Sequence, residues 1–264
     1  MNTSAPPVTD DEASEDGDLS RDRFLDGRLT LLQPRQGYRA AIDPVFLAAS
    51  IDAGPGESVL DVGTGAGAAA LALAARLDDV RVAGIEIQRD LVRLAQRNIA
   101  DNGLARRIDI MAGDLLHPPS RLAAASFHHV MMNPPYAEAG SGTAPPNASK
   151  ARAHMESEAL LADWIAFAHR MVRPRGSVTV IHRADRLAQI LEAFGPDFGE
   201  VTVFPLWPGG KDAANKPAKR VLVRARRGVK TPMALKPGLV LHGEDGRYAP
   251  EAEAILRGAA ALSI

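Results

Sequence analysis

The sequence has 264 residues, a formal net charge of −1 and a hydrophobic content of 46%, which is ample for a folded core. The complete lack of cysteine excludes disulfides, thiolate catalysis and cysteine-based zinc sites, and the seven histidines have no paired metal spacing. No run of about 18 apolar residues predicts a membrane span, and no basic and apolar leader indicates secretion, so we expect a cytoplasmic protein without a metal.

Residues 1–20 are predicted to be a disordered acidic leader. They include six acidic residues, no lysine or arginine, and few large apolar residues. Without these acids the chain carries a formal charge of about +5, a positive balance that favours a nucleic-acid partner. Residues 21–52 are expected to form an N-terminal extension. Residues 53–264 are expected to form one domain, and the alternation of strands and helices over residues 53–206 implies a parallel sheet.

The first strand of this domain is predicted over residues 58–62, followed by a glycine-rich loop and an alanine-rich helix over residues 68–76. Glycines let the backbone approach a ligand closely, and a helix N-terminus favours an anionic group. The loop also satisfies the dinucleotide pattern G-x-G-x-x-A. Asp61, close before the first glycine, argues for a different ligand, because it suits a cationic amino-acid headgroup and repels a pyrophosphate. The loop residues assigned to this donor site are Gly63, Thr64, Gly65 and Gly67.

Two further strands are predicted over residues 80–85 and 108–111, and each leads to an acidic residue. Glu86 suits ribose hydroxyls, although NAD sites use an acid there too, and Asp114 suits an adenine amino group. The alternative for these acids is a cap or a solvated strand end. Together, the glycines and three acids at successive strand ends favour S-adenosylmethionine over NAD as the cofactor. The residues that directly follow the second and third acids, Ile87 and Leu115, are included in the predicted donor site.

A fourth strand, predicted over residues 127–132, delivers Asn133, Pro134, Pro135 and Tyr136 to the carboxyl edge of the sheet, where open α/β sheets bind ligands. The layout suits methyl transfer to an amide-like nitrogen, whose conjugated lone pair makes it a poor nucleophile. The Asn133 side-chain oxygen and the Pro134 carbonyl oxygen can accept hydrogen bonds from one NH₂ group and free the lone pair, and neither proline offers a competing N–H. Pro135 and Tyr136 are predicted to contact the flat substrate, Tyr136 by stacking. The alternative is a strand end stopped by prolines.

The remaining elements follow in chain order. Helices are predicted over residues 90–102 and 160–172, and strands over residues 177–181, 201–206 and 220–226. The loop over residues 137–153 is rich in glycine, proline and serine, and loops of this length are often functional. Lys150 and Arg152, near its end, are predicted to contact phosphate or a base, with a solvated segment as the alternative.

Residues 205–236 carry the strongest local charge signal, with nine bases opposed by one acid. Lys219 and Arg220 are predicted to contact RNA from this segment. The alternative is a solvated hairpin edge, since edge strands often carry charges that block aggregation.

Several of these motifs are similar to those of a known family. Residues 59–67 and 133–136 resemble motifs of the class I S-adenosylmethionine-dependent methyltransferases, and a narrower resemblance points to the tRNA1(Val) adenine-N6 methyltransferase family. The stretches that carry the narrower resemblance are 37–48, 84–88, 94–98 and 219–223. The resemblance implies a Rossmann-like α/β fold whose seven-stranded, mostly parallel sheet has helices on both faces and an antiparallel last strand. The chain departs from the family in its acidic leader, in the loop after Tyr136 and at Pro44, where relatives more often carry alanine.

The resemblance implies methyl transfer to adenine N6 of a tRNA, with the target base taken from the anticodon loop. Tyr38 and Arg39 are then predicted to cover the donor site and Asp43 to line its methionine end, with packing and capping at a helix start as the alternative. A protein glutamine N5-methyltransferase faces the same chemical problem, but such enzymes carry a helical N-terminal domain for their protein substrate. A non-catalytic scaffold that binds the cofactor or RNA has no need of Asn-Pro-Pro-Tyr. The sequence leaves open whether the protein is a monomer or a homodimer.

Overall fold

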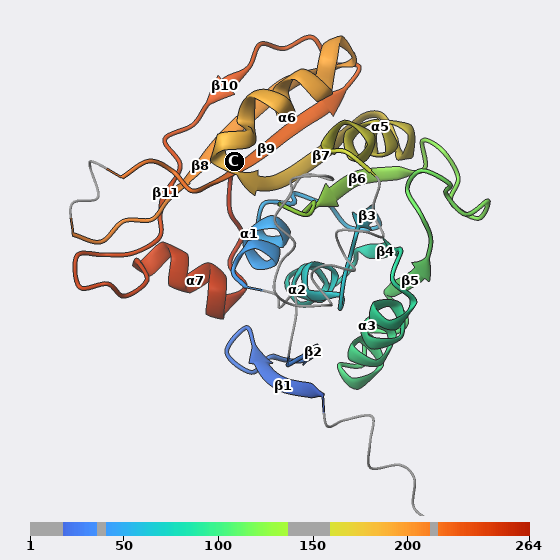
Figure 1. Ribbon diagram of the computed structural model, residues 1–264, viewed down its shortest axis with the longest axis horizontal. Helices are drawn as coiled ribbons and strands as arrows, with labels where there is room; N and C mark the ends of the chain where they lie inside the picture. The colour runs from blue at the N-terminus through green and yellow to red at the C-terminus, as the bar shows by residue number, and fades with distance from the viewer. Residues whose placement is uncertain (1–17, 36–40, 137–158, 212–215) are drawn as a thin grey trace, which may run out of the picture.

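The computed structural model of this chain describes residues 18–35, 41–136, 159–211 and 216–264 (Figure 1). Most of the predicted leader, together with Tyr38, Arg39, Lys150 and Arg152, lies outside the described residues. The chain first forms an antiparallel hairpin of β1 (Leu19–Phe24) and β2 (Leu29–Pro34). The first strand therefore begins at Leu19, inside the segment that the composition assigned to the leader. A strand begins there in which half-buried and exposed positions alternate over most of its length.

The domain is built on a sheet whose seven long strands run in the order β5-β4-β3-β6-β7-β9-β8. Their bounds are β3 Ser58–Val62, β4 Arg81–Glu86, β5 Ile108–Ala112, β6 Phe127–Met132, β7 Val172–Arg183, β8 Phe198–Trp207 and β9 Arg220–Arg227. The pairs from β5 to β7 are parallel, and β9 is antiparallel to both β7 and β8. This arrangement confirms the predicted class I methyltransferase sheet. Two short strands, β10 (Ala234–Leu235) and β11 (Leu239–Val240), extend it beside β8.

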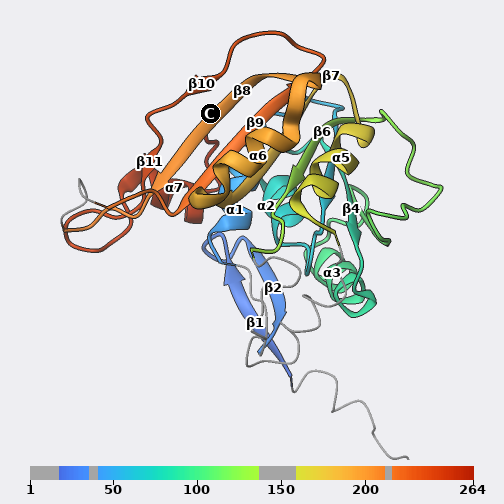
Figure 2. The same ribbon diagram turned by 45° about the horizontal axis from the view of Figure 1, so that its top comes forward.

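Helices cover both faces of the sheet, as Figures 1 and 2 show. One face carries α1 (Asp43–Ala49), α2 (Ala68–Arg76), α3 (Arg89–Asp101) and α7 (Pro250–Gly258). The other carries α5 (Leu161–Met171) and α6 (Leu187–Phe194). Each face has its own apolar core, because successive residues of a strand point to opposite sides. None of the helices in the described part of the chain is long and apolar enough to cross a membrane.

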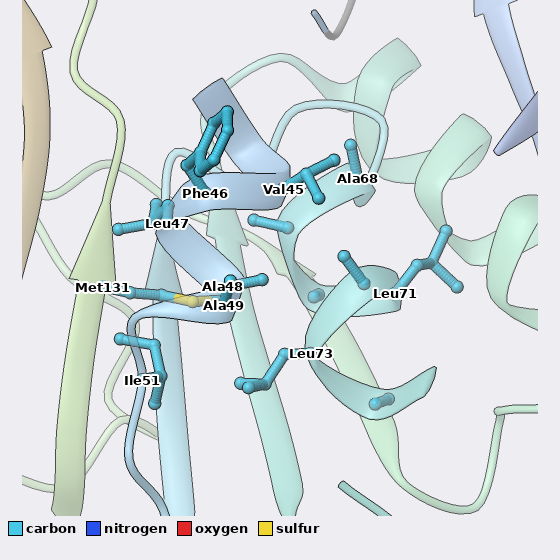
Figure 3. Packing of buried hydrophobic residues seen from close by; sticks show 14 of the residues in the cluster. Val45, Phe46, Leu47, Ala48, Ala49, Ile51, Ala68, Leu71, Leu73 and Met131 are labelled. Atoms are coloured by element: carbon cyan, nitrogen blue, oxygen red, sulfur yellow. The ribbon is translucent and has the colours of Figure 1, made fainter. Parts of the chain in front are cut away.

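The core between α1 and α2 explains the alanine-rich helix of the sequence (Figure 3). Phe46 and Leu47 of α1 and Leu71 of α2 are fully buried there, together with Met131 of β6. Most alanines of α2 are also buried, so this helix has little solvent-facing surface. Their small side chains let α1 pack closely against α2, and α1 is thereby held beside the carboxyl edge of the sheet.

The hairpin is attached to the domain by two asparagines of α3, one turn apart. Asn98 is completely buried; its amide accepts from the Leu32 N–H at 2.8 Å and donates to the carbonyls of Leu32 at 3.0 Å and Ala66 at 2.9 Å. Asn102 makes the same paired contacts with the backbone of Thr30, at 2.9 and 2.7 Å. The two amides thus act on β2 as a neighbouring strand would, and Asn98 also connects the hairpin to the glycine-rich loop.

We expect Asn98→Ala to lower the free energy of unfolding by about 1–3 kcal/mol, because it leaves buried backbone groups of β2 and the loop without partners. Urea denaturation measures the change. Gln96→Ala is a matched control, since Gln96 is an exposed amide on the same helix with one hydrogen bond, to Ile110. The control should lie within about 0.5 kcal/mol of the wild type. Equal losses in both variants would contradict the proposed role of Asn98.

Candidate active site

The glycine-rich loop joins the end of β3 to the start of α2. Gly63, Gly65 and Gly67 all have positive φ angles, of 68°, 57° and 88°, which favour glycine. A side chain at Gly63 would also collide with the ring of Trp164, which lies 2.4 Å from the position of the missing Cβ. At Gly65 nothing lies within 4 Å of that position. The protein's own packing therefore requires Gly63, whereas Gly65 leaves backbone open to a ligand.

Two buried carboxylates hold this loop. Asp61, at the end of β3, accepts a hydrogen bond of 2.6 Å from the Thr64 hydroxyl. Glu86, at the end of β4, accepts from the backbone N–H of Gly65 and of Gln88, both at 2.9 Å. Burial raises the pKa of Asp61 to about 7, against the hydrogen bond from Thr64, and the nearby Glu86 raises it further. Because burial and Glu86 both oppose the ionisation of Asp61, a cationic ligand beside it would be favoured.

A pocket lies in front of the loop, and residues from five parts of the chain line it. They include the predicted residues Asp61, Gly63, Thr64, Gly65 and Asn133, and also Gln33, Pro34, Pro44 and Leu91, which were not predicted to line it. Gln33 and Pro34 come from β2, whose place over the loop depends on Asn98, so no local pattern identified them. Pro44 did stand out as a departure from the family, and it lines the pocket from the first turn of α1.

The residues predicted for the adenine end lie at the ends of β4 and β5. Ile87, directly after Glu86, leaves 39% of its surface exposed. Both oxygens of Asp114 have protein partners: one accepts from the Leu116 N–H at 2.9 Å, and the other lies 3.0 Å from His117 Nδ1. Asp114 thus makes the capping contact that the sequence offered as its alternative role. Leu115 is partly buried against the core on the α5 face.

The Asn-Pro-Pro-Tyr segment directly follows β6. Pro134 is buried, Pro135 is exposed, and the side-chain oxygen of Asn133 is buried. The Tyr136 hydroxyl donates to Asp43 Oδ2, and Arg220 Nε donates to the same oxygen at 2.9 Å. The Arg220 guanidinium also lies 4.5 Å from the centre of the Tyr136 ring, in a cation–π contact.

These contacts change the roles predicted for three residues. Asp43, expected at the methionine end of the donor site, binds Tyr136 and Arg220. Arg220 is one of the site's own contacts rather than part of a separate basic surface. The guanidinium covers one ring face of Tyr136, so that face is closed to a substrate. No sequence pattern predicted the contact between Asp43 and Arg220, because the two residues are 177 positions apart.

The basic segment does not form one continuous surface. β9 lies between β7 and β8, so the explanation as a hairpin edge is wrong. Arg224 donates to the Ile264 carbonyl at 2.5 Å, Arg226 to the Arg175 carbonyl at 2.9 Å, and Arg227 to the Val172 carbonyl at 2.6 Å. Most of the arginines on β9 thus serve internal contacts, while Lys219 is exposed at the carboxyl edge.

The sheet order, the glycine loop with its two buried acids and the Asn-Pro-Pro-Tyr segment together define a class I methyltransferase whose methyl donor is S-adenosylmethionine. The open backbone at Gly65 and the carboxylates of Asp61 and Glu86 fit the amino-acid and ribose parts of that cofactor. Residues 42–204 match the model of the methyltransferase small domain family, and the chain belongs to this family.

Individual relatives agree with this assignment. A tRNA1(Val) (adenine(37)-N6)-methyltransferase from Porphyromonas gingivalis is 29% identical, over 88% of this chain and 92% of its own length. A protein of the same name from a second strain is 30% identical, over 73% and 75%. A solved structure from Agrobacterium tumefaciens, described as a predicted O-methyltransferase, is 26% identical with a TM-score of 0.70, and the match covers 84% of this chain and 99% of that one. An O-methyltransferase from Thermotoga maritima, at 15% identity and a TM-score of 0.52 over 74% and 68%, shares the fold.

The raised pKa of Asp61 gives a pH dependence with a definite sign. The folded protein retains a proton that the unfolded chain, with a pKa of 3.8, releases. The contribution of this group to stability is therefore complete below pH 3.8 and is lost as the pH rises through about 7. Relative to the wild type, Asp61→Asn should gain stability as the pH rises from about 4 to about 7, and the difference should level off at higher pH. Denaturation of both proteins across this range measures the difference.

Donor affinity should show the opposite trend, because ionised Asp61 attracts the cationic headgroup. Calorimetry with S-adenosylmethionine should show tighter binding by the wild type as the pH rises through about 7, and no such rise for Asp61→Asn. Asp78→Asn, at an exposed position, is the control and should follow the wild type. A wild-type affinity that does not depend on pH would argue against contact between Asp61 and the headgroup.

Proposed function

We propose that the chain transfers a methyl group to N6 of an adenine in a tRNA. The observation that carries the proposal is the Asn-Pro-Pro-Tyr segment at the carboxyl end of β6, where Asn133 lines the donor pocket. Donor and acceptor groups therefore meet at one residue. The names of the Porphyromonas relatives, which match over most of their length, support adenine N6 of tRNA as the acceptor.

S-adenosylmethionine, bound in the donor pocket, supplies a methyl group on a positively charged sulfur. The Asn133 side-chain oxygen and the Pro134 carbonyl oxygen accept hydrogen bonds from the N6 amine, which frees its lone pair and stabilises the positive charge that develops there. No residue needs to remove a proton before attack, because the methylated amine is acidic enough to lose it to water. Tyr136 contacts the base with the side of its ring that faces away from Arg220.

A nitrogen acceptor fits this site better than a hydroxyl acceptor. Methylation of a hydroxyl is helped by a base that removes its proton. Asp43 and Arg220 are paired with each other beside Tyr136. His182, the imidazole in contact with Tyr136, has its pKa lowered to about 4, mainly by burial, and is a weak base.

Nucleoside mass spectrometry tests the acceptor, with tRNA from cells that carry or lack the gene. The proposal requires N6-methyladenosine that disappears with the gene and returns when purified protein and donor are added. Purified release factor, analysed for methylglutamine, is the parallel substrate for the glutamine alternative. If the release factor were methylated and the tRNA were not, the protein would be a glutamine methyltransferase and the proposal would be wrong.

Asn133→Ala should lower kcat by about 10²–10³, the usual cost of removing one preorganised transition-state contact. Donor affinity should stay close to that of the wild type, because the loop and the two buried acids remain. Single-turnover methylation of tRNA and calorimetry with the donor measure the two quantities separately. Full single-turnover activity would show that Asn133 does not polarise the amine.

RNA contact is expected at the carboxyl edge, where β7 ends and β9 begins beside Tyr136. Arg183 and Arg220 are neighbours in the register, and the Ala184 N–H donates to the Lys219 carbonyl at 3.1 Å. Arg183→Glu with Lys219→Glu should weaken tRNA binding and flatten its salt dependence, because phosphate contacts release counterions. Arg220 is left intact in this test, since its reversal would also break the contacts with Asp43 and Tyr136.

The matched control reverses one arginine and one lysine at the opposite edge of the sheet. Arg175 and Lys230 are both exposed there, where β7 enters the sheet and after β9 leaves it. Arg175→Glu with Lys230→Glu makes the same change of net charge and should leave the salt slope nearer to that of the wild type. Filter binding at several salt concentrations compares the three proteins. Equal effects of the two reversals would mean that general charge, and not the carboxyl edge, attracts the RNA.

A further inference from the structure

Arg220 places a positive charge beside the acceptor end of the site. It is the first residue of β9, opposite Arg183 of β7 in the register, and 29% of its side chain is exposed. Its guanidinium lies 4.5 Å from the centre of the Tyr136 ring, and its Nε donates to Asp43 Oδ2 at 2.9 Å. The same carboxylate oxygen accepts from the Tyr136 hydroxyl. Side chains from α1, from β9 and from the segment after β6 thus meet at one oxygen atom.

This cluster of Asp43, Tyr136 and Arg220 is joined to the donor pocket on two sides. Pro44, the neighbour of Asp43, lines the pocket, and so does Asn133, three residues before Tyr136. Asp43 is only 6% exposed, so water screens the charges of the cluster weakly on that side. A ligand in the pocket is therefore exposed to the sum of these charges.

An uncompensated positive charge at this place would conflict with the chemistry of methyl transfer. The donor carries a positive charge on its sulfur. During transfer the sulfur keeps the electron pair of the C–S bond, and the lone pair of the accepting nitrogen forms the new bond to carbon. The positive charge then lies on the nitrogen until a proton leaves to water. One positive charge is thus in the site at every stage, and a second one in partly buried surroundings repels it.

The surroundings of two neighbouring arginines show why Arg220 needs a partner from the protein. Arg183 donates to Asp185 at 3.0 Å, and about half of each of these two side chains is exposed, so water screens both charges. Arg220 is less exposed, and its partner Asp43 is buried. Burial opposes the charged form of Arg220, and the hydrogen bond to Asp43 is the main effect against it, so that the pKa of Arg220 is raised overall and the guanidinium stays charged.

We propose that Asp43 is a positioning residue that also compensates charge: together with Arg220 it holds the Tyr136 ring, and it cancels the charge of Arg220 so that a cationic donor can bind beside the pair. The part that concerns Tyr136 and the acceptor rests on the proposed function, whereas the part that concerns donor binding does not. A pair that only stabilised the fold would affect every ligand of the pocket alike. Charge compensation instead distinguishes a cationic ligand from a neutral one.

Calorimetry with S-adenosylmethionine and with S-adenosylhomocysteine separates these two roles, because the second ligand lacks the methyl group and its sulfur is neutral. Asp43→Asn keeps the size of the side chain and one acceptor oxygen but removes the negative charge. We expect its affinity for S-adenosylmethionine to fall by about tenfold, the order of magnitude for one uncompensated charge in a partly buried site. Its affinity for S-adenosylhomocysteine should stay close to that of the wild type, which also shows that the variant is folded.

Removing the arginine as well tests whether Arg220 carries the charge that Asp43 cancels. In Asp43→Asn with Arg220→Gln, the ratio of the two affinities should return to that of the wild type. The kcat for tRNA should remain below that of the wild type, because Tyr136 is held less firmly. Arg220→Gln by itself should not lower the ratio, since no guanidinium is left to compensate. Equal weakening of both ligands by Asp43→Asn, or a ratio that stays low in the double variant, would overturn the proposal.

Glu200→Gln is the matched control, because Glu200 pairs with Arg226 at 3.3 Å, near the opposite end of the same strand. It takes the same charge from an arginine of β9 and should keep the wild-type ratio of affinities. A fall as large as that of Asp43→Asn would mean that net charge, and not the cluster, sets the ratio. Donor binding is measured without RNA. If the wild type did not methylate tRNA but the ratios changed as expected, the acceptor would be wrong while the charge compensation by Asp43 would stand.

Discussion

The conformation of the glycine-rich loop is the constraint on which the rest of the site depends. Three side chains from three elements hold it: Asp61 binds the Thr64 hydroxyl, Glu86 binds the Gly65 N–H, and Asn98 binds the Ala66 carbonyl. Two of these side chains are buried acids, and one of them, Asp61, also lines the pocket. Asn98 additionally carries the hairpin, so the same helix residue fixes the floor of the donor pocket and the segment in front of it. The hydrogen bonds that fix the shape of the glycine-rich loop therefore also hold the acid that favours a cationic cofactor.

The donor and acceptor ends are coupled through the start of α1. Pro44 lines the donor pocket, and its neighbour Asp43 binds Tyr136 and Arg220 on the acceptor side. The buried face of α1, packed on α2, keeps both residues in place. A change in the packing of this short helix would move both ends of the site together, and it would do so without altering any residue that touches the reacting atoms.

The basic residues that cluster in the sequence over residues 205–236 do not all lie on the surface of the folded protein. The nine bases of residues 205–236 suggested a basic face. However, β9 lies between β7 and β8, and helices and loops cover much of its two faces, so most of its side chains are partly or fully buried. Arg224, Arg226 and Arg227 bind backbone carbonyls, and Arg220 binds Asp43. Of the exposed bases, Lys219 lies where β9 begins, next to the proposed acceptor site.

The sequence by itself determined the elements whose signals are local. Hydrophobic runs bounded by glycines and prolines gave β3, α2 and β6 with the bounds that the structure has, and residue types at strand ends indicated the donor pocket and the methyl transfer. The hairpin, α6 and α7 carried no such signal. Only the tertiary structure decided the partners of Asn98, Asp43, Arg220 and His182, because each pairs with residues from another element. Their contacts follow from how strands align and helices pack, and a pattern read along the chain does not contain that information.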